Sequence, residues 1–131
     1  MIRRKLLIGA SMLGLGGFVA RAQAATTAHY DAATFAAAQA AGKPILVAVH
    51  ASWCPTCAKQ RPIIDELAGR AENRDLVILM VDFDSQKDVV KSFDVRMQST
   101  LIAFNGKVER ERSVGITDPA AIGALVAKAR G

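Results

Sequence analysis

The chain has 131 residues, enough for one modest domain, and 51% of them are hydrophobic while only 5% are aromatic, so we expect a largely aliphatic core. The net charge is +5, but the first 24 residues hold four of the 17 basic residues and none of the 12 acidic ones. The other 107 residues carry 13 basic and 12 acidic residues, and this near balance excludes a general nucleic-acid-binding surface, so we expect no nucleic-acid partner.

The first 24 residues have the pattern of an export signal. Basic residues from Arg3 to Lys5 precede an apolar stretch over residues 6–20, and the small-x-small sequence Ala22-Gln23-Ala24 follows. The apolar stretch is shorter than the about 20 residues of a membrane span. We therefore expect cleavage after Ala24, no stable membrane anchor and, for a bacterial chain, delivery to the periplasm, which permits disulfides. The pair Arg3-Arg4 fits both a twin-arginine signal and the ordinary charge of a general secretory signal.

Residues 25–131 are expected to form one domain in which helices and strands alternate after a short disordered start. The predicted elements are a helix from Asp31 to Gly42, a strand over 45–49, a helix from Pro55 through Leu67, a strand over 76–81, a short helix with Val89, Val90 and Phe93 capped by Asp84 or Ser85, a strand over 100–104, an Asn105-Gly106 turn, a strand over 107–114 and a helix begun by Thr117-Asp118-Pro119. Parallel strands joined by helices and closed by a hairpin predict an α/β fold, with a central mixed sheet and helices on both faces.

The two cysteines lie in the sequence Trp53-Cys54-Pro55-Thr56-Cys57, between the first predicted strand and the helix that follows it. This stretch resembles the active site of the thioredoxin family. The resemblance covers roughly residues 31–130 and includes Lys43-Pro44, Pro62, Val81-Asp82-Phe83-Asp84, Thr100-Leu101, Asn105-Gly106-Lys107 and Gly115. It implies a thioredoxin-like domain over residues 25–131 that acts on protein disulfides, and we expect no cofactor.

The chemistry of thiol–disulfide exchange supports that role for the two cysteines. The attacking species is a thiolate, and Cys54 lies where the chain enters a helix, so free backbone N–H groups and the helix dipole can stabilise its charge. Cys57 follows three residues later on the same face. We therefore predict that Cys54 is the nucleophile and Cys57 the resolving thiol, with Trp53 shielding the site and offering partner chains an apolar surface.

Two other uses of the cysteines are less well supported. A purely structural disulfide would close a very short loop and remove little chain entropy. A zinc site needs four ligands, and the chain offers only two cysteines with His29 and His50, of which His29 falls in the start expected to be disordered. We predict redox use and no bound metal.

Ser99 is the first departure from the family pattern. The resemblance places a cis-proline immediately before the Thr100-Leu101 pair, facing the cysteines, and here that position is serine. Because a cis bond before a non-proline residue costs about 3–4 kcal/mol, we predict a trans Gln98–Ser99 peptide. The hydroxyl and N–H of Ser99 would lie close to the thiols, where either could donate to a thiolate; alternatively, serine only fills the space.

A buried acid–base pair is also absent. The family has an aspartate six residues before the first cysteine and a partnering lysine on the next strand, and these positions are Ala48 and Met80 here. Cys57 must therefore lose its proton to water or to another group. His50, four residues before Cys54, titrates in the useful range; the alternative is a surface histidine that replaces an aromatic residue.

The residues between the cysteines, Pro55 and Thr56, differ from the glycine and proline of thioredoxins, and they influence the reduction potential without revealing its value. The leading hypothesis is a periplasmic thiol–disulfide oxidoreductase that reduces protein disulfides and is fed with electrons by a membrane partner. The rival is a module of the same fold that holds a metal or one partner through its thiols, without general redox turnover.

Overall fold

The computed structural model describes residues 16–17 and 24–131, so the predicted export signal over 1–24 lies almost wholly outside the described residues. The elements are β1 (Thr26–His29), α1 (Ala32–Ala40), β2 (Pro44–His50), α2 (Pro55–Ala68), the 3₁₀ turn η1 (Ala71–Asn73), β3 (Val77–Asp82), α3 (Lys87–Ser92), β4 (Thr100–Asn105), β5 (Val108–Val114) and α4 (Pro119–Ala129). In these two described ranges, no helix is long and apolar enough to cross a membrane.

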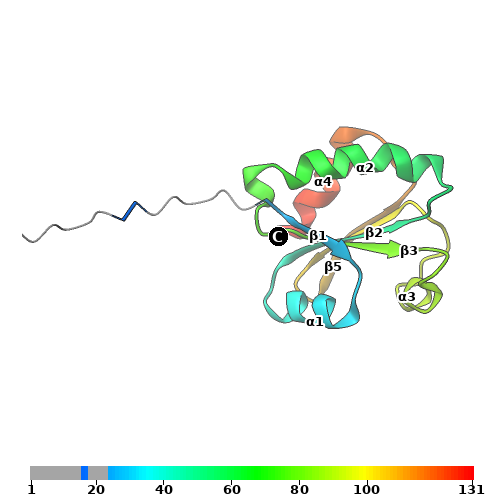
Figure 1. Ribbon diagram of the computed structural model, residues 1–131, viewed down its shortest axis with the longest axis horizontal. Helices are drawn as coiled ribbons and strands as arrows, with labels where there is room; N and C mark the ends of the chain where they lie inside the picture. The colour runs from blue at the N-terminus through cyan, green and yellow to red at the C-terminus, as the bar shows by residue number, and fades with distance from the viewer. Residues whose placement is uncertain (1–15, 18–23) are drawn as a thin grey trace, which may run out of the picture.

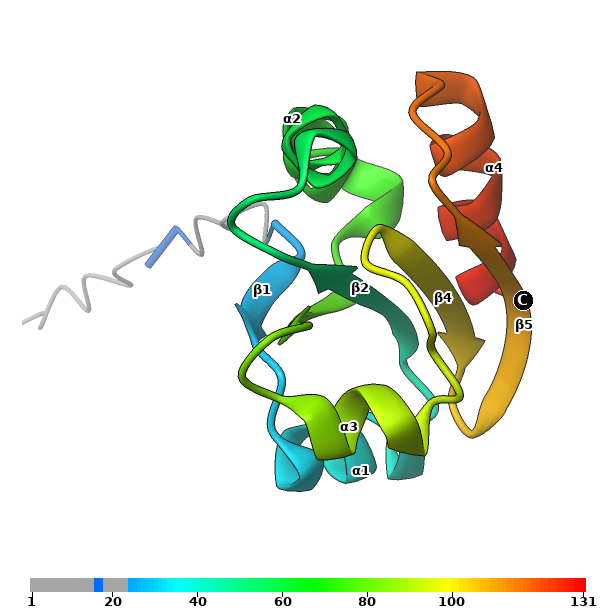
Figure 2. The ribbon, with the colours of Figure 1, turned by 90° about the vertical axis from the view of Figure 1, so that its right-hand side faces the viewer.

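The strands form one five-stranded sheet in the order β1-β3-β2-β4-β5. β1 and β2 run parallel to β3, whereas β4 runs antiparallel to β2 and β5 antiparallel to β4. Helices α1 and α3 cover one face of this sheet, and α2 and α4 cover the other (Figures 1 and 2). The predicted α/β architecture, a mixed sheet between two layers of helices, is confirmed.

β1 corrects the expectation of a disordered start. Thr26–His29 pairs with the edge of β3, and the N–H of Tyr30 donates to the Met80 carbonyl at 2.8 Å just beyond the strand. The segment is short and has no apolar alternation, so it becomes a strand only because the backbone N–H and C=O groups at the free edge of β3 pair with it. His29 is therefore an ordered residue of the sheet.

Two predicted turns and caps differ in detail. The hairpin between β4 and β5 turns at Gly106 and Lys107, and Gly106 has a φ of 55°, which glycine adopts without strain. The N-cap of α3 is Gln86, with no side-chain cap, in place of the expected Asp84 or Ser85. The amides of those two residues instead donate to the Asp82 carboxylate, at 3.0 and 2.8 Å.

Alternation along β2 divides the core into two clusters, because successive side chains of a strand point to opposite faces. Ile45, Val47 and Val49 face α1 and α3, where aromatic rings complete the packing. Leu46 and Ala48 face α2 and α4 within an aliphatic cluster. The strand ends at His50, on the side that bears Ala48 and α2, and the chain then turns into the residues that carry the cysteines.

Candidate active site

Cys54 is the residue that caps the N-terminus of α2. Its backbone is extended, with φ −89° and ψ 111°, and Pro55 occupies the first turn, where a missing N–H has no cost. The Sγ atom of Cys54 accepts the backbone N–H of Cys57 at 3.1 Å. A sulfur at this position satisfies a helix-end donor, and the same donor stabilises a thiolate.

Cys57 lies one turn into α2, and the two cysteines are free thiols that are 3% and 8% exposed, for Cys54 and Cys57 respectively. Burial raises the pKa of the Cys57 thiol to about 11, and its hydrogen bond with the Cys54 sulfur acts in the same direction. The backbone amides of Ala51 and Ser99 act the other way and do not cancel this effect. The two thiols are therefore unequal: Cys54 receives hydrogen bonds, and Cys57 retains its proton.

Ser99 lies on the loop opposite the cysteines and has a φ of 61°, in the left-handed region. Its N–H donates to the Val49 carbonyl at 2.8 Å, which fastens the loop to β2. The described peptide bonds are all trans, as predicted for Gln98–Ser99. Thr100 begins β4, and its hydroxyl donates to the Met97 carbonyl at 2.7 Å, so this hydroxyl stabilises the loop.

Gln60 is a residue of the site that the sequence reasoning missed. Its side chain is buried in α2, and its Nε2 donates to the carbonyls of Ser99 at 3.2 Å and Ile116 at 2.9 Å. A signal was present, because Cys57, Gln60 and Ile64 share the helical spacing that marks a buried face. The amide of Gln60 ties the helix that carries the cysteines to the loop that faces them.

Trp53, expected to shield the cysteines, is 57% exposed, and its indole N–H donates to the Asp84 carboxylate at 2.7 Å. Of the two residues between the cysteines, Pro55 is exposed and Thr56 half-buried. Met97, two residues before Ser99, is 54% exposed. The loops before Cys54 and before Ser99 thus each present one exposed apolar side chain.

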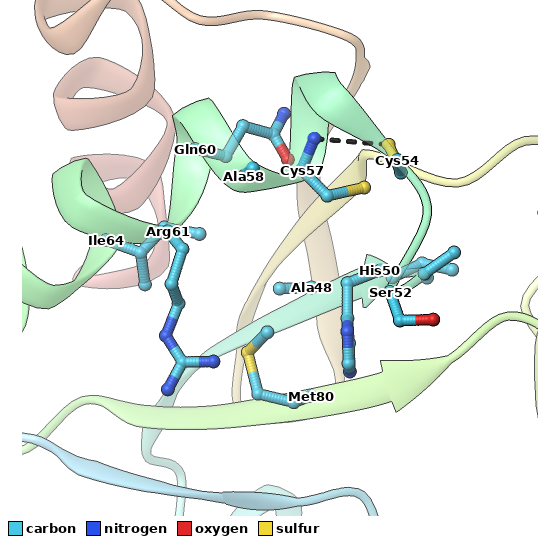
Figure 3. A pocket seen from close by; sticks show the side chains of 12 residues that line it. Ala48, His50, Ser52, Cys54, Cys57, Ala58, Gln60, Arg61, Ile64 and Met80 are labelled. Atoms are coloured by element: carbon cyan, nitrogen blue, oxygen red, sulfur yellow. Dashed lines mark hydrogen bonds between the residues drawn. The ribbon is translucent and has the colours of Figure 1, made fainter.

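A cavity of about 180 Å³ lies under α2 and reaches both cysteines. Figure 3 shows Cys57 and Arg61 on α2 and Ala48, His50 and Met80 on the strands around this space. His50 is half-buried, and its Nε2 is buried without a hydrogen-bond partner in the part of the chain that the structure describes. The side chain is thus partly enclosed, with one ring nitrogen out of contact with solvent. Ala48 and Met80 leave this space without the acid–base pair of the family.

Asp82 lies opposite His50 in the register of β2 and β3. Hydrogen bonds from Ser85 hold the pKa of the Asp82 carboxyl below its usual range, and His50 contributes a smaller effect in the same direction.

Over residues 16–17 and 24–131, no three histidine, cysteine or acidic side chains are grouped so that they could hold a metal ion.

Comparison with known proteins identifies the family of this chain. The thioredoxin family model matches residues 26–128. Thioredoxin from Chlamydia trachomatis is 36% identical over 84 residues, which cover 64% of this chain and 80% of that protein. The bifunctional thioredoxin reductase/thioredoxin of Mycobacterium leprae is 33% identical over 92 residues, and this match spans 70% of the chain but 20% of the Mycobacterium protein.

A crystal structure of Trxlp from Edwardsiella tarda EIB202 is also similar, with a TM-score of 0.75 and 40% sequence identity, covering 77% of this chain and 98% of that one. The family match, the fold and a dithiol at the start of α2 agree. The chain belongs to the thioredoxin family and is a thiol–disulfide oxidoreductase.

Proposed function

We propose that this protein is a periplasmic reductase of protein disulfides that works through the Cys54–Cys57 dithiol. The Cys54 thiolate attacks one sulfur of a substrate disulfide, forms a mixed disulfide and releases the first substrate thiol. Cys57 then loses its proton and attacks the Cys54 sulfur, which forms the Cys54–Cys57 disulfide and releases the second substrate thiol. Two electrons pass from the dithiol to the substrate disulfide.

The inequality of the two thiols carries this assignment. The Cys54 sulfur is the N-cap of α2 and accepts the Cys57 N–H at 3.1 Å, whereas burial raises the pKa of Cys57 to about 11. Of the two sulfurs, that of Cys54 occupies the N-cap, where a backbone N–H can stabilise the charge of an attacking thiolate. Cys57 is held in reserve, one helical turn away, for the intramolecular second step.

The surroundings support a protein substrate and a reducing direction. Trp53 and Met97 present exposed apolar side chains of the kind that contact a partner chain. Between β2 and β3 the chain forms only α2 and η1, without an inserted module to hold unfolded chains as oxidases do. Each cycle leaves the dithiol oxidised, so a reductase needs an electron donor, which we place in the membrane beside an oxidising compartment.

Trapping variants test the assignment. With a disulfide-bonded substrate such as insulin, Cys57→Ser should accumulate a mixed disulfide on Cys54, seen as a mass increase that a reductant reverses. Cys54→Ser should form none and should lose turnover. Accumulation on Cys57 in Cys54→Ser, at a rate like that of the parent, would overturn the assigned roles.

The reduction potential of the dithiol tests the direction. Equilibration with glutathione, on protein that starts at Ala25, should give a value near thioredoxin's, about −270 mV. A value near about −120 mV would make the protein an oxidant. The proposed export is tested separately, because cell fractionation should recover the mature chain outside the cytoplasm, with Ala25 as its first residue.

A further inference from the structure

Two cavities adjoin under α2, and His50 lines both of them. The inner cavity of about 180 Å³ reaches the two cysteines, and the outer cavity of about 160 Å³ lies beside β1. The linings have three residues in common: His50, Arg61 and Met80. The pair of cavities therefore leads from the resolving thiol, past one imidazole, to the edge strand of the sheet.

The chemistry of the resolving step requires a proton acceptor at this place. Cys57 must become a thiolate before it can attack the mixed disulfide, yet burial raises the pKa of its thiol to about 11. The inner cavity is several times larger than the about 30 Å³ that a water molecule occupies in the liquid, so water can carry a proton across it. The imidazole of His50 lines this cavity, and its Nε2 has no hydrogen-bond partner among residues 16–17 and 24–131.

The titratable and charged groups that face His50 are His29 on β1, Asp82 on β3, and Arg61, Cys54 and Cys57 on α2. Arg61 cannot give up its proton in a protein, and it pairs with Asp65 at 3.1 Å. Asp82 accepts the amides of its own loop, which lower the pKa of its carboxyl and make it a weak base. His29 lines only the outer cavity. The imidazole of His50 is the remaining base that lines the cavity of the thiols.

We propose that His50 accepts the proton of Cys57 during the resolving step, through water in the inner cavity, and then releases it to solvent. The Cys57 S–H bond breaks, and the proton passes through water to the unprotonated ring nitrogen of His50. The thiolate attacks the Cys54 sulfur, and the substrate thiolate leaves and takes a proton from solvent. This inference rests on the proposed function, and it assigns His50 to the deprotonation of Cys57 in the second step only.

A two-phase reaction separates this inference from the proposed function. One equivalent of 5,5′-dithiobis(2-nitrobenzoate) mixed with the reduced protein releases a first thionitrobenzoate when Cys54 attacks, and a second when Cys57 resolves the mixed disulfide. We expect His50→Gln to leave the first phase unchanged and to slow the second about 100-fold at pH 7, at the lower end of what a positioned base contributes. His29→Gln is the matched control, because His29 takes no part in the transfer, and both of its phases should match the parent.

Two further readouts distinguish proton transfer from a structural role. In the parent, the second phase should already be fast at neutral pH, because a positioned base accepts the proton of Cys57. In His50→Gln it should instead keep rising into the alkaline range, because burial raises the pKa of the Cys57 thiol. Free imidazole should restore at least about a tenth of the parent rate to His50→Ala, because it supplies the missing base.

The outcomes separate the two proposals. A normal first phase with an unchanged second phase in His50→Gln would overturn the role of His50 and leave the oxidoreductase intact. Equal slowing of both phases, or an imidazole effect that is the same for the parent and for His50→Ala, would reduce His50 to a structural residue. Failure of the first phase in the parent would instead overturn the proposed function.

Discussion

The two faces of the sheet are packed in different ways. On the α1 and α3 face, the rings of Tyr30, Phe35, Phe93 and Phe104 lie with centroids 5.3–6.0 Å apart, mostly tilted or edge to face. On the α2 and α4 face the side chains are aliphatic, and a small residue, Ala48, borders the cavity of the cysteines. The cluster of four rings thus lies on the face of the sheet opposite α2, and the cavity of the cysteines borders the aliphatic face.

The difference between the two faces follows from the alternation of side chains along each strand. Odd residues of β2 face the aromatic layer and even ones face α2, so one strand supports dense packing on one side and an open site on the other. Changes on the aromatic face should therefore alter stability, while those on the α2 face should alter thiol chemistry. Four substitutions or conditions can test this separation, from the largest expected effect on stability to the smallest.

The largest effect is expected from Phe104→Ala. Phe104 is buried in β4 and its ring lies against Phe35 and Phe93, so truncation removes aromatic contacts and leaves a cavity. The free energy of unfolding should fall by about 3–5 kcal/mol. Urea titration measures this change, and the first thionitrobenzoate phase of the folded variant should equal that of the parent. A slower first phase would show that the two faces are not separate.

The loop of Ser99 should respond next most strongly. Ser99→Pro removes the N–H that donates to Val49 and prohibits the observed φ of 61°, so we expect a loss of about 1–3 kcal/mol. Ser99→Gly is the matched control, because glycine adopts that backbone freely, and it should stay within about 1 kcal/mol of the parent. Equal stability of the proline variant and the parent, in the same denaturant titration, would mean that the loop accepts a second conformation.

Alkaline pH should lower the free energy of unfolding of the reduced protein. The pKa of Cys57 rises from its ordinary value of 9.0 to about 11 on folding, so the folded state holds this proton more tightly than the unfolded state. The resulting stability is complete below about pH 9 and is lost as the pH rises to about 11, by on the order of 1–3 kcal/mol. Unfolding titrations across this window measure it. Cys57→Ala should lack this part of the decline, and an identical decline in both proteins would contradict the pKa.

The smallest effect on stability is expected from Ala48→Val. The added methyl groups enter the cavity beneath α2, so the free energy of unfolding should stay within about 1.5 kcal/mol of the parent. The second thionitrobenzoate phase should nevertheless slow, because less room remains for water between Cys57 and His50. Val47→Ala, on the other face of β2, should show the opposite behaviour, with a larger loss of stability and normal phases.

The predictable parts of the molecule are those with local signals. The apolar run of β2, the proline at the start of α2 and the spacing of Cys54 and Cys57 indicate the sheet, the helix and the dithiol through residues that are close together in the chain. β1 has no such signal, because Thr26–His29 is short, lacks alternation and becomes a strand only by pairing with β3. Long-range pairing of this kind is decided by tertiary structure.

The same distinction holds within the site. The absence of an acid at Ala48 is visible in the sequence, but the cavity that results depends on how α2 sits over β2 and β3. The expected caps of α3 were wrong because the Asp82 carboxylate accepts the amides of Asp84 and Ser85 and holds them in a turn that precedes the helix. The helical spacing of Gln60 indicates that it is buried, but its hydrogen-bond partners have no local signal, because they lie 39 and 56 residues further along the chain.

The single amide of Gln60 has a consequence for how this protein opens. It connects α2 with the carbonyls of Ser99 and Ile116, so the wall that carries Cys57 and the wall that faces it cannot separate without breaking both bonds. Regions joined in this way exchange their amide hydrogens as one cooperative unit, with a common opening free energy. The helix that carries Cys57 and the segment of Ile116 should therefore open together, and oxidation of the cysteines should change the amide exchange rate at Ile116.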